Sequence, residues 1–282
     1  MTILLTGATG FIGRNLKECW QNRYDLASPS HEELNLLDTA AVESYLRERR
    51  FDVVIHAANT NDVVHPERAA HLLDCNLRMF CNLERCSGLY GRMYYFGSGA
   101  EYDSTHYTPN MPESCFGKHI PADPYGFSKY VMSKIAGRSH NIHDLRLFGV
   151  FGKYEEWRRR FISNMIYQAL NSRTMHMDRH MFFDFLYVDD LAAIMERFIT
   201  HAPEYHHYNV CSGQRWDLYD LALMVKEETG SDAKVVIAGE GWKRPYTGDN
   251  SRLRAELGEL RLTPMREAVR EMILFYRKTG FQ

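Results

Sequence analysis

The segment TILLTGATGFIG, residues 2–13, runs from a short apolar stretch directly into three closely spaced glycines. The apolar part predicts a β-strand, and the residues from 11 to about 21 predict a helix. A dinucleotide-binding turn needs a backbone that can approach a pyrophosphate and a helix N-terminus directed at it. The GxxGxxG spacing therefore predicts a dinucleotide-binding loop, with a tight turn that binds nothing as the alternative. The glycines concerned are Gly7, Gly10 and Gly13.

The rest of the first half alternates β-rich runs with helical stretches, a pattern typical of parallel βαβ units. Runs that predict strands occupy 52–58, 92–98 and 144–150, and two later runs at 183–188 and 208–211 also predict strands. Helices are expected at 69–87, 124–138 and 189–199, from the N-cap Asp217 to 229, and after the N-cap and N1 pair Thr263-Pro264. We therefore expect an α/β fold: a Rossmann-type doubly wound parallel sheet with a smaller C-terminal substrate-binding lobe.

Two parts of the chain, residues 153–183 and 213–282, fit this rhythm less well. We assign residues 1–152 together with about 184–212 to a dinucleotide-binding Rossmann domain. The two remaining parts are assigned to the smaller lobe. We expect this lobe to pack at the edge where the carboxyl ends of the strands open, because ligands of such sheets bind there.

Composition argues against several classes of function. The chain has 282 residues and a formal net charge of −2, so no strong field favours nucleic acid or a membrane surface. No stretch approaches the roughly 18 apolar residues of a membrane span, and the N-terminus lacks the basic region of a signal peptide. Six cysteines without a CxxC pair predict reduced thiols and a cytoplasmic protein. His176 and His180 lack a third ligand, so no metal site is expected.

A second group of residues suits acid–base chemistry. Tyr125 and Lys129 lie four residues apart in PYGFSKY, on one face of the expected helix. A nearby ammonium lowers the pKa of a phenol, ordinarily about 10, so the phenol can exchange protons closer to neutrality. Ser98, in FGSGAEYD, ends the preceding strand and can hydrogen-bond a carbonyl or carbinol oxygen. The set suits hydride transfer at a sugar or alcohol carbon, with a surface YxxxK pair and a turn serine as the alternatives.

The choice between the two nicotinamide dinucleotides depends on the end of the second strand. Selection of NAD usually places an Asp or Glu about 20 residues after the glycine loop, where it binds the ribose 2′-hydroxyl. Ser28 and Ser30 stand in that place, and Glu32 and Glu33 follow slightly later. Arg14, directly after the third glycine, is either a ligand for a 2′-phosphate or a solvated helix residue. The balance favours NADP(H) over NAD(H).

Six motifs follow one another in an informative order. They are TGATGFIG at 6–13, HAA at 56–58, SGAEY at 98–102, YGFSK at 125–129, LRLFGVFG at 145–152 and FLYVDDLA at 185–192. In this order the chain resembles the extended short-chain dehydrogenase/reductases nearly end to end, and in particular their nucleotide-sugar epimerase/dehydratase branch. Residues 32–58, EELNLLDTAAVESYLRERRFDVVIHAA, are especially similar to GDP-fucose synthases, which epimerise and reduce GDP-4-keto-6-deoxy sugars.

The resemblance implies roles for individual residues. Ser98 is expected to be catalytic, Tyr125 to be the acid/base, and Lys129 to hold the nicotinamide ribose. Expected cofactor contacts are Gly7, Thr9, Gly10, Phe11, Ile12, Gly13, Arg14, Asn35, Leu36, Ala57, Ala58, Asn59, Asn76, Tyr125, Lys129 and Phe148. Expected substrate contacts are Ser98, Gly99, Ala100, Tyr125, Gly149 and Arg160.

The chain departs from this pattern where substrate chemistry is decided. Ala100 stands where GDP-fucose synthases carry an epimerising cysteine, and the segment around Arg160 lacks their histidine. Gly99 and Ala100 also replace the Asp-Glu pair of 4,6-dehydratases, which need an acid and a base there. The sequence therefore predicts neither 3,5-epimerisation nor water elimination.

Two further departures affect positions that commonly contact the nucleotide diphosphate of the substrate in these relatives. Many relatives have Asn where this chain has Gly149, and Arg where it has Phe183. The choice of nucleotide is therefore left open. Candidate replacements are Arg158, Arg159, Arg160, Arg179, Lys243 and Arg244. A solvated helix face is the alternative interpretation of the EEWRRR run.

These observations favour a 4-keto reductase of a nucleotide-diphosphate deoxysugar, with hydride delivered from NADPH to C4. A 4-epimerase with tightly held NAD, or a C4 dehydrogenase, would use the same three residues. A regulator that binds a dinucleotide without turnover is the third hypothesis, since a fold alone does not determine function. The resemblance also implies a homodimer formed through the helices near 69–87 and 125–138.

Overall fold

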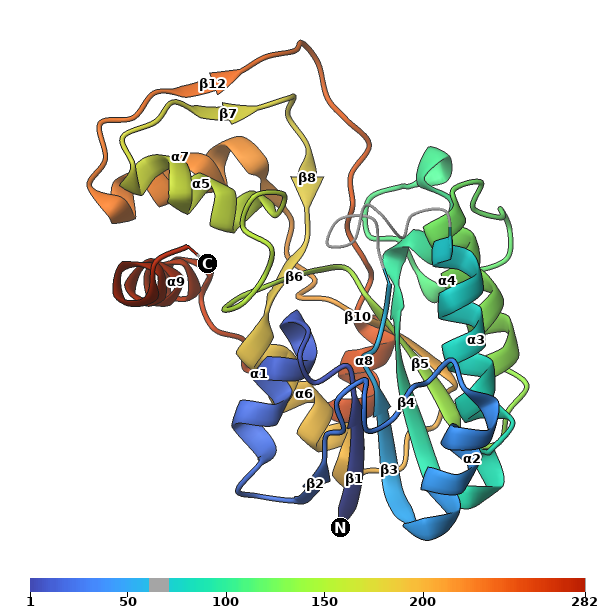
Figure 1. Ribbon diagram of the computed structural model, residues 1–282. Helices are drawn as coiled ribbons and strands as arrows, with labels where there is room; N and C mark the ends of the chain where they lie inside the picture. The colour runs from blue at the N-terminus through green and yellow to red at the C-terminus, as the bar shows by residue number, and fades with distance from the viewer. Residues whose placement is uncertain (61–70, 282) are drawn as a thin grey trace.

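The computed structural model describes residues 1–60 and 71–281, and its centre is a six-stranded parallel sheet (Figure 1). The strand order is β10-β5-β4-β3-β1-β2. The strands are β1 (Thr2–Thr6), β2 (Asp25–Ala27), β3 (Phe51–His56), β4 (Tyr90–Ser98), β5 (Ile142–Leu147) and β10 (His207–Val210). After β2 the chain crosses to the other side of β1, and this reversal opens a crevice at the carboxyl ends of the strands. The expected doubly wound Rossmann-type sheet is therefore confirmed.

Helices cover both faces of the sheet, which explains why most residues of its strands are buried. Within β1, Ile3 and Leu5 belong to one buried cluster, and Leu4 between them belongs to the other. The first cluster lies under α1 (Phe11–Trp20) and α6 (Val188–Thr200). The second lies under α2 (Thr39–Glu48), α3 (Leu72–Glu84) and α4 (Pro124–Ala136).

A second group of elements lies beyond the carboxyl ends of the strands, at the upper left of Figure 1. It contains α5 (Phe161–Leu170), β7 (Met175–Met177), α7 (Leu218–Thr229), β12 (Val235–Ile237) and α9 (Met265–Thr279). Short strand pairs connect it to the sheet: β6 (Gly149–Phe151) with β9 (Phe185–Tyr187), and β8 (Phe182–Phe183) with β11 (Trp216–Asp217). One apolar core extends from Ile3 of β1 to Met272 of α9, so both groups of elements share it.

The expected strand at 144–150 is divided in the structure. The chain leaves the sheet at Phe148, and the Gly149 amide donates to the Asp184 carbonyl instead of continuing the ladder. The expected run 183–188 is divided in the same way, between β8 and β9.

Other boundaries also move. The final helix begins at Met265, and Thr263 is not its N-cap because its amide and hydroxyl both donate to the Asp190 carboxylate. The start of the helix expected at 69–87 lies outside the described residues.

The helix α8 (Ser251–Leu257) packs beside β10, where Arg252 donates to the His207 carbonyl. Short 3₁₀ helices are η2 (Ser87–Leu89), η3 (Gly99–Glu101), η4 (Ser104–His106) and η5 (Glu113–Cys115).

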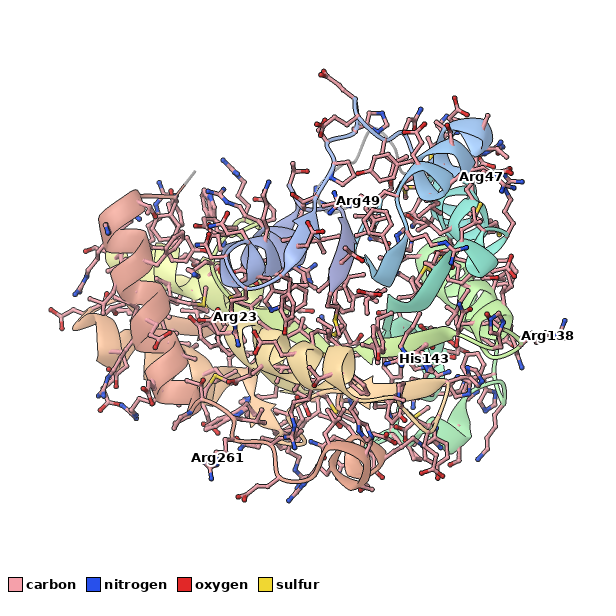
Figure 2. All side chains as sticks on the ribbon, turned by 90° about the horizontal axis from the view of Figure 1, so that it is seen from below. Arg23, Arg47, Arg49, Arg138, His143 and Arg261 are labelled. Carbon is pink, nitrogen blue, oxygen red and sulfur yellow. The ribbon has the colours of Figure 1, made fainter. Side chains whose placement is uncertain are left out.

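The amino ends of the strands carry arginines that hold structure. Arg23 precedes β2 and pairs with Glu196, and Arg49 precedes β3 and pairs with Asp25 at 2.6 Å. Figure 2 views the molecule from this end and labels both side chains. Along the described parts of the chain, no helix is long and apolar enough to cross a membrane. The same residues contain no group of three or more His, Cys, Asp or Glu side chains placed to hold a metal ion.

Candidate active site

The glycine loop is packed so tightly that it excludes side chains. Gly7 has a φ of +71°, and a Cβ on it would lie 2.5 Å from the Ala58 amide nitrogen. A Cβ on Gly13 would collide with the Gly7 carbonyl oxygen. Gly10 precedes α1 without a capping side chain, so amides of the first turn are left for a ligand. Of the remaining predicted loop residues, Thr9 is exposed, and Phe11 and Ile12 are half-buried against the core.

The turn after β3 forms the other wall of this cradle. The Ala58 amide donates to the Thr6 hydroxyl at 3.3 Å, which ties Ala57 and Ala58 to the glycine loop. The Asn59 side-chain oxygen is buried and has no hydrogen-bond partner among the described residues. A narrow glycine cradle, an open helix N-terminus and an unpartnered amide oxygen fit a dinucleotide.

Several predicted cofactor contacts hold the protein's own backbone. Asn76 accepts from the Thr60 amide and donates to the Thr60 carbonyl, both at 2.8 Å, so it orders the turn that follows β3. The Asn35 side chain accepts from the Leu37 amide at 3.0 Å. Leu36 is buried, and its carbonyl accepts from Asn82 at 2.8 Å. These residues therefore shape the turns that follow β2 and β3 through the backbone.

Arg14 contacts Tyr154, a residue of the part of the chain assigned to the smaller lobe. Its guanidinium lies 3.6 Å from the centre of the Tyr154 ring and 3.7 Å from the Glu18 carboxylate. At the end of β2, the Ser30 amide donates to Glu33 at 2.7 Å and lowers the pKa of that carboxyl. The expected preference for NADP(H) remains a proposal.

The three predicted catalytic residues meet at the carboxyl end of β4. Asp123 caps α4 by accepting from the Gly126 amide at 2.7 Å, and Pro124 occupies the first turn. This start brings Tyr125 beside the Ser98 side chain. One turn later, the Lys129 ammonium lies 5.7 Å from the centre of the Tyr125 ring and donates to the Phe96 carbonyl at 2.8 Å.

Burial and charge tune these groups in opposite directions. Desolvation raises the pKa of Tyr125, while the Ser98 hydrogen bond and the charge of Arg160 partly offset that rise. Desolvation lowers the pKa of Lys129 to about 8, against the attraction of Glu101 and Asp144. The Lys129 amine therefore titrates nearer neutrality than it would in water, whereas the Tyr125 phenol keeps the proton that an acid must donate.

A buried ionic cluster lies beneath Ser98, and sequence reasoning did not identify it. Arg146 is fully buried and donates to Glu101 at 2.6 Å and to Asp144 at 3.1 Å. The other Glu101 oxygen accepts from the Ser98 amide at 2.9 Å, which fixes the end of β4. The available signal was the pair of charged residues, Asp144 and Arg146, within the expected strand at 144–150.

The predicted substrate residues surround the same place. Ala100 is half-buried, and a Cβ on Gly126 would lie 2.6 Å from its carbonyl oxygen. Arg160 precedes α5, is exposed, and lies close enough to lower the pKa of Tyr125 by its charge. Gly149 is buried, and any side chain there would collide with the Phe183 ring. The phenyl group that replaces the usual Arg thus occupies the space that an Asn at 149 would need.

The other candidate cations have different surroundings. Arg179 and Lys243 both pair with Asp178, at 3.8 and 2.5 Å. Arg158 pairs with Glu156 at 3.2 Å. Arg160 and Arg244 are exposed.

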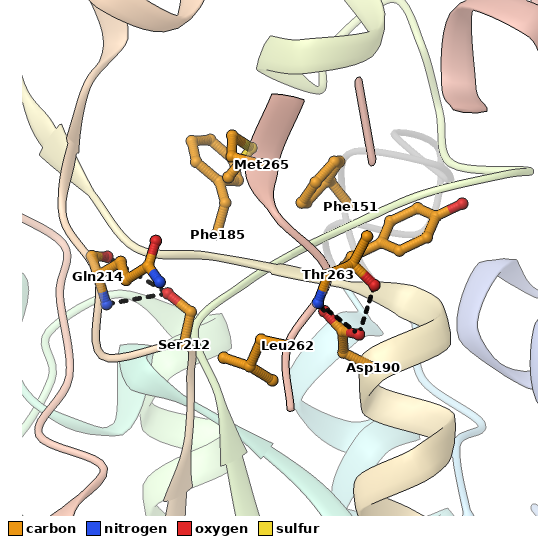
Figure 3. A pocket seen from close by; sticks show the side chains of 9 residues that line it. Phe151, Phe185, Asp190, Ser212, Gln214, Leu262, Thr263 and Met265 are labelled. Atoms are coloured by element: carbon orange, nitrogen blue, oxygen red, sulfur yellow. Dashed lines mark hydrogen bonds between the residues drawn. The ribbon is translucent and has the colours of Figure 1, made fainter. Parts of the chain in front are cut away.

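A small pocket near β6 and β9 lies apart from the predicted site (Figure 3). Its lining consists of Phe151, Phe185, Tyr187, Asp190, Ser212, Gln214, Leu262, Thr263 and Met265. The Asp190 carboxylate accepts a hydrogen bond from the Thr263 hydroxyl, and the Gln214 backbone amide donates to the Ser212 hydroxyl. The pocket contains none of the predicted catalytic or cofactor residues, and its polar groups serve to hold the loop before α9.

Two relatives of known activity illustrate the sequence likeness. A GDP-L-fucose synthase of Azorhizobium caulinodans is 36% identical over 84 residues, which cover 29% of this chain and 27% of that protein. An ADP-L-glycero-D-manno-heptose-6-epimerase of Cupriavidus pinatubonensis is 26% identical over 261 residues, covering 80% of this chain and 77% of that protein. The first match spans only about a quarter of the relative, so it shows a likeness of that segment alone.

Solved structures share the whole fold. A Bordetella bronchiseptica enzyme in complex with NAD and UDP superposes with a TM-score of 0.86 at 19% identity, over 100% of this chain and 96% of that one. A GDP-mannoheptose C4 reductase of Campylobacter jejuni with NADP bound gives a TM-score of 0.82 at 17% identity, over 98% of both chains. At such identities the likeness concerns the fold.

Residues 3–211 match the family described as "NAD dependent epimerase/dehydratase family", which is most of the chain. The predicted resemblance to extended short-chain dehydrogenase/reductases is thereby confirmed, as is the prediction of an NAD(P)-dependent enzyme of the nucleotide-sugar epimerase and reductase group. Fold, glycine cradle and sequence match agree, and the chain belongs to the NAD dependent epimerase/dehydratase family.

Proposed function

We propose that this protein is a 4-keto reductase of a nucleotide-diphosphate deoxysugar. One observation carries the proposal. Ser98, Tyr125 and Lys129 converge at the end of β4, while the neighbouring positions Gly99 and Ala100 carry no group able to remove a carbon-bound proton. The arrangement supplies a proton to an oxygen but offers no acid–base pair at the adjacent carbons.

A reduced nicotinamide dinucleotide supplies the hydride in this chemistry, which converts the C4 ketone to an alcohol. Tyr125 donates its phenolic proton to the ketone oxygen as that oxygen gains charge, and later recovers a proton from solvent. The Ser98 hydroxyl donates a hydrogen bond to the same oxygen and stabilises the developing negative charge. The Lys129 ammonium favours the Tyr125 phenolate that remains, because it lies 5.7 Å from the ring.

The substrate side supports an anionic, nucleotide-activated sugar without identifying its base. Arg160 lies within electrostatic reach of Tyr125, and Arg244 is exposed on the segment that leads to Tyr246. We propose that these two cations bind the diphosphate, because the side chains at Gly149 and Phe183 offer it no hydrogen-bond donor. Exchange of NADP(H) at every turnover belongs to the same proposal.

A second candidate is an NAD-dependent 4-epimerase, or a dehydrogenase that stops at the ketone. The long match to a heptose-6-epimerase favours it, and the same three residues would serve it. Such enzymes keep their cofactor through the cycle and need no external reductant.

A homodimer through α3 and α4 is also proposed. Met79, Tyr130 and Ile135 of these helices are partly exposed, whereas Phe80 and Met132 are buried in the protomer. Six free cysteines support a reducing compartment such as the cytoplasm. Sedimentation at micromolar concentration tests the dimer, and a monomer there would remove it.

The reaction is tested in two steps. First, protein purified without added cofactor is denatured, and the released dinucleotide is identified by mass spectrometry. Next, NADPH oxidation is followed against a panel of 4-keto-6-deoxy nucleotide sugars in deuterium oxide, with Tyr125→Phe as the inactive control. We expect NADPH consumption without deuterium at C3 or C5. Stoichiometric NAD with no NADPH consumption would support the epimerase, and deuterium at C3 or C5 would refute the argument from Ala100.

A further inference from the structure

Tyr246 reaches the catalytic serine from a distant part of the chain. It lies between β12 and α8, and its backbone is held on both sides. Its amide donates to the Phe182 carbonyl at 2.9 Å, and its carbonyl accepts from the Asp184 amide at 3.0 Å. The ring centre lies 5.1 Å from that of Phe148 and 5.3 Å from that of Tyr107. The phenol is therefore held in place by an aromatic cage and two backbone hydrogen bonds.

The hydroxyl of this phenol meets the Ser98 side chain. The Ser98 side chain lies beside both the Tyr246 phenol and the Tyr125 phenol. A Cβ on Gly99 would lie 2.8 Å from the Tyr246 oxygen, so the glycine after the catalytic serine leaves room for this approach. Two phenols thus converge on one serine hydroxyl, and only one of them belongs to the YxxxK motif.

The valence of the hydroxyl limits how these contacts can be arranged. A serine hydroxyl has one hydrogen to donate and two lone pairs to accept with. The Ala100 amide already donates to Ser98 Oγ at 3.1 Å. If Tyr246 donates to the second lone pair, the Ser98 hydrogen is left for Tyr125 or for the ketone oxygen. If Ser98 instead donates to Tyr246, it has no hydrogen for the reacting oxygen.

We propose that Tyr246 is a positioning residue whose hydroxyl donates to Ser98 and thereby directs the Ser98 hydrogen toward Tyr125 and the reacting oxygen. The inference rests on the proposed function in that it takes Ser98 and Tyr125 as the proton-donating pair. A hydroxyl that accepts a hydrogen bond also becomes a stronger donor. A hydrogen bond from Tyr246 would therefore strengthen the one that Ser98 donates to Tyr125 or to the reacting oxygen. Ser98 thereby stabilises the Tyr125 phenolate.

The test is a titration of residue 125 alone in the full chain. 3,5-Difluorotyrosine is incorporated at position 125, because its more acidic phenol titrates where the protein is folded, and phenolate absorbance is followed with NADP⁺ present. We expect Tyr246→Phe to raise the pKa at position 125 by about 0.5–1 pH unit, the size of one hydrogen bond. Ser98→Ala should raise it at least as much, and Tyr246→Phe should add nothing in the Ser98→Ala background.

A matched control separates this effect from a general disturbance of the aromatic cage. Tyr107 packs against Tyr246, but its hydroxyl donates to the Gly99 carbonyl at 3.0 Å, so Tyr107→Phe should leave the titration unchanged. A downward shift in Tyr246→Phe, no shift, or an equal shift in the Ser98→Ala background would overturn the inference. The titration needs no sugar substrate, so its outcome is independent of whether the reductase proposal succeeds.

Discussion

The Lys129 ammonium lies 5.7 Å from the centre of the Tyr125 ring, one helical turn away on α4. The amine is 3% exposed and donates to the Phe96 carbonyl, so its charge is held in a poorly solvated place. Burial of this charge costs stability, but it strengthens the effect of the charge on the neighbouring phenol. The placement of Lys129 beside Tyr125 is therefore a cost to the stability of the fold.

Lys129→Met should lower the activity and raise the stability of the protein. The folded-state pKa of about 8 lies below the ordinary value of 10.5, so the unfolded chain binds more protons between these values. The penalty of the buried charge is therefore complete below pH 8 and fades as the pH rises toward 10.5. We therefore compare the unfolding free energy of the variant with that of the wild type at two pH values. The advantage of the variant should be larger at pH 7 than at pH 10.5 by up to about 3 kcal/mol. Urea unfolding across this range measures it, and a constant difference would contradict the burial argument.

Tyr125→Phe and Ser98→Ala should each reduce turnover because they remove the proton donor and its hydrogen-bonding partner. General acid–base groups typically contribute about 100- to 10,000-fold, and we expect losses in this range. The measurement is the rate of NADPH oxidation with the best sugar from the panel. Dinucleotide affinity, measured by calorimetry, serves as the control and should change little for Ser98→Ala. Full turnover by either variant would refute the assignment.

Gly13→Ala should abolish dinucleotide binding, since the new Cβ would collide with the Gly7 carbonyl in the cradle. Gly88→Ala is a matched control because its Cβ would meet nothing within 4 Å. Calorimetric titration of both variants with NADP⁺ and NAD⁺ checks the expectation. Equal affinities in the two variants would show that this loop does not hold the cofactor.

Gly149→Ala should destabilise the fold by about 1–3 kcal/mol, the usual cost of overpacking. The added Cβ would collide with the Phe183 ring and lie 2.5 Å from the Asp184 carbonyl oxygen. In a Phe183→Ala background one of these collisions disappears, so the cost should be smaller. Chemical denaturation of the double-mutant cycle measures this coupling, and strict additivity would contradict the packing relationship.

Glu155→Gln should alter the pH dependence of stability in the acid range. Burial raises the pKa of Glu155 to about 7 from an ordinary value of 4.5, although the Ser163 hydroxyl donates to it. The folded chain therefore binds more protons between these values, and its stability falls as the pH rises through them. Relative to the variant, the wild type should lose about 3 kcal/mol between pH 4 and pH 8. Parallel pH profiles of the two proteins would exclude a neutral buried Glu155.

Much of this protein could be predicted from short segments. The glycine loop, the strand-helix alternation and the Tyr125–Lys129 pair depend on spacings within one turn or one strand, and such spacings are properties of local backbone geometry. Element boundaries were less predictable. Thr263 has the character of an N-cap, but its hydroxyl is drawn to Asp190 of a distant helix, so the last helix begins at Met265.

The fold class and the family could be predicted from the sequence alone, because both are encoded in short contiguous motifs. Three relationships are visible only in the folded protein: Tyr246 reaches Gly99 beside Ser98, Arg146 and Glu101 form a buried pair, and Phe183 fills the space above Gly149. These relationships join segments far apart in the chain. Their energies come from packing and desolvation, which arise only when the lobe and the sheet are folded together.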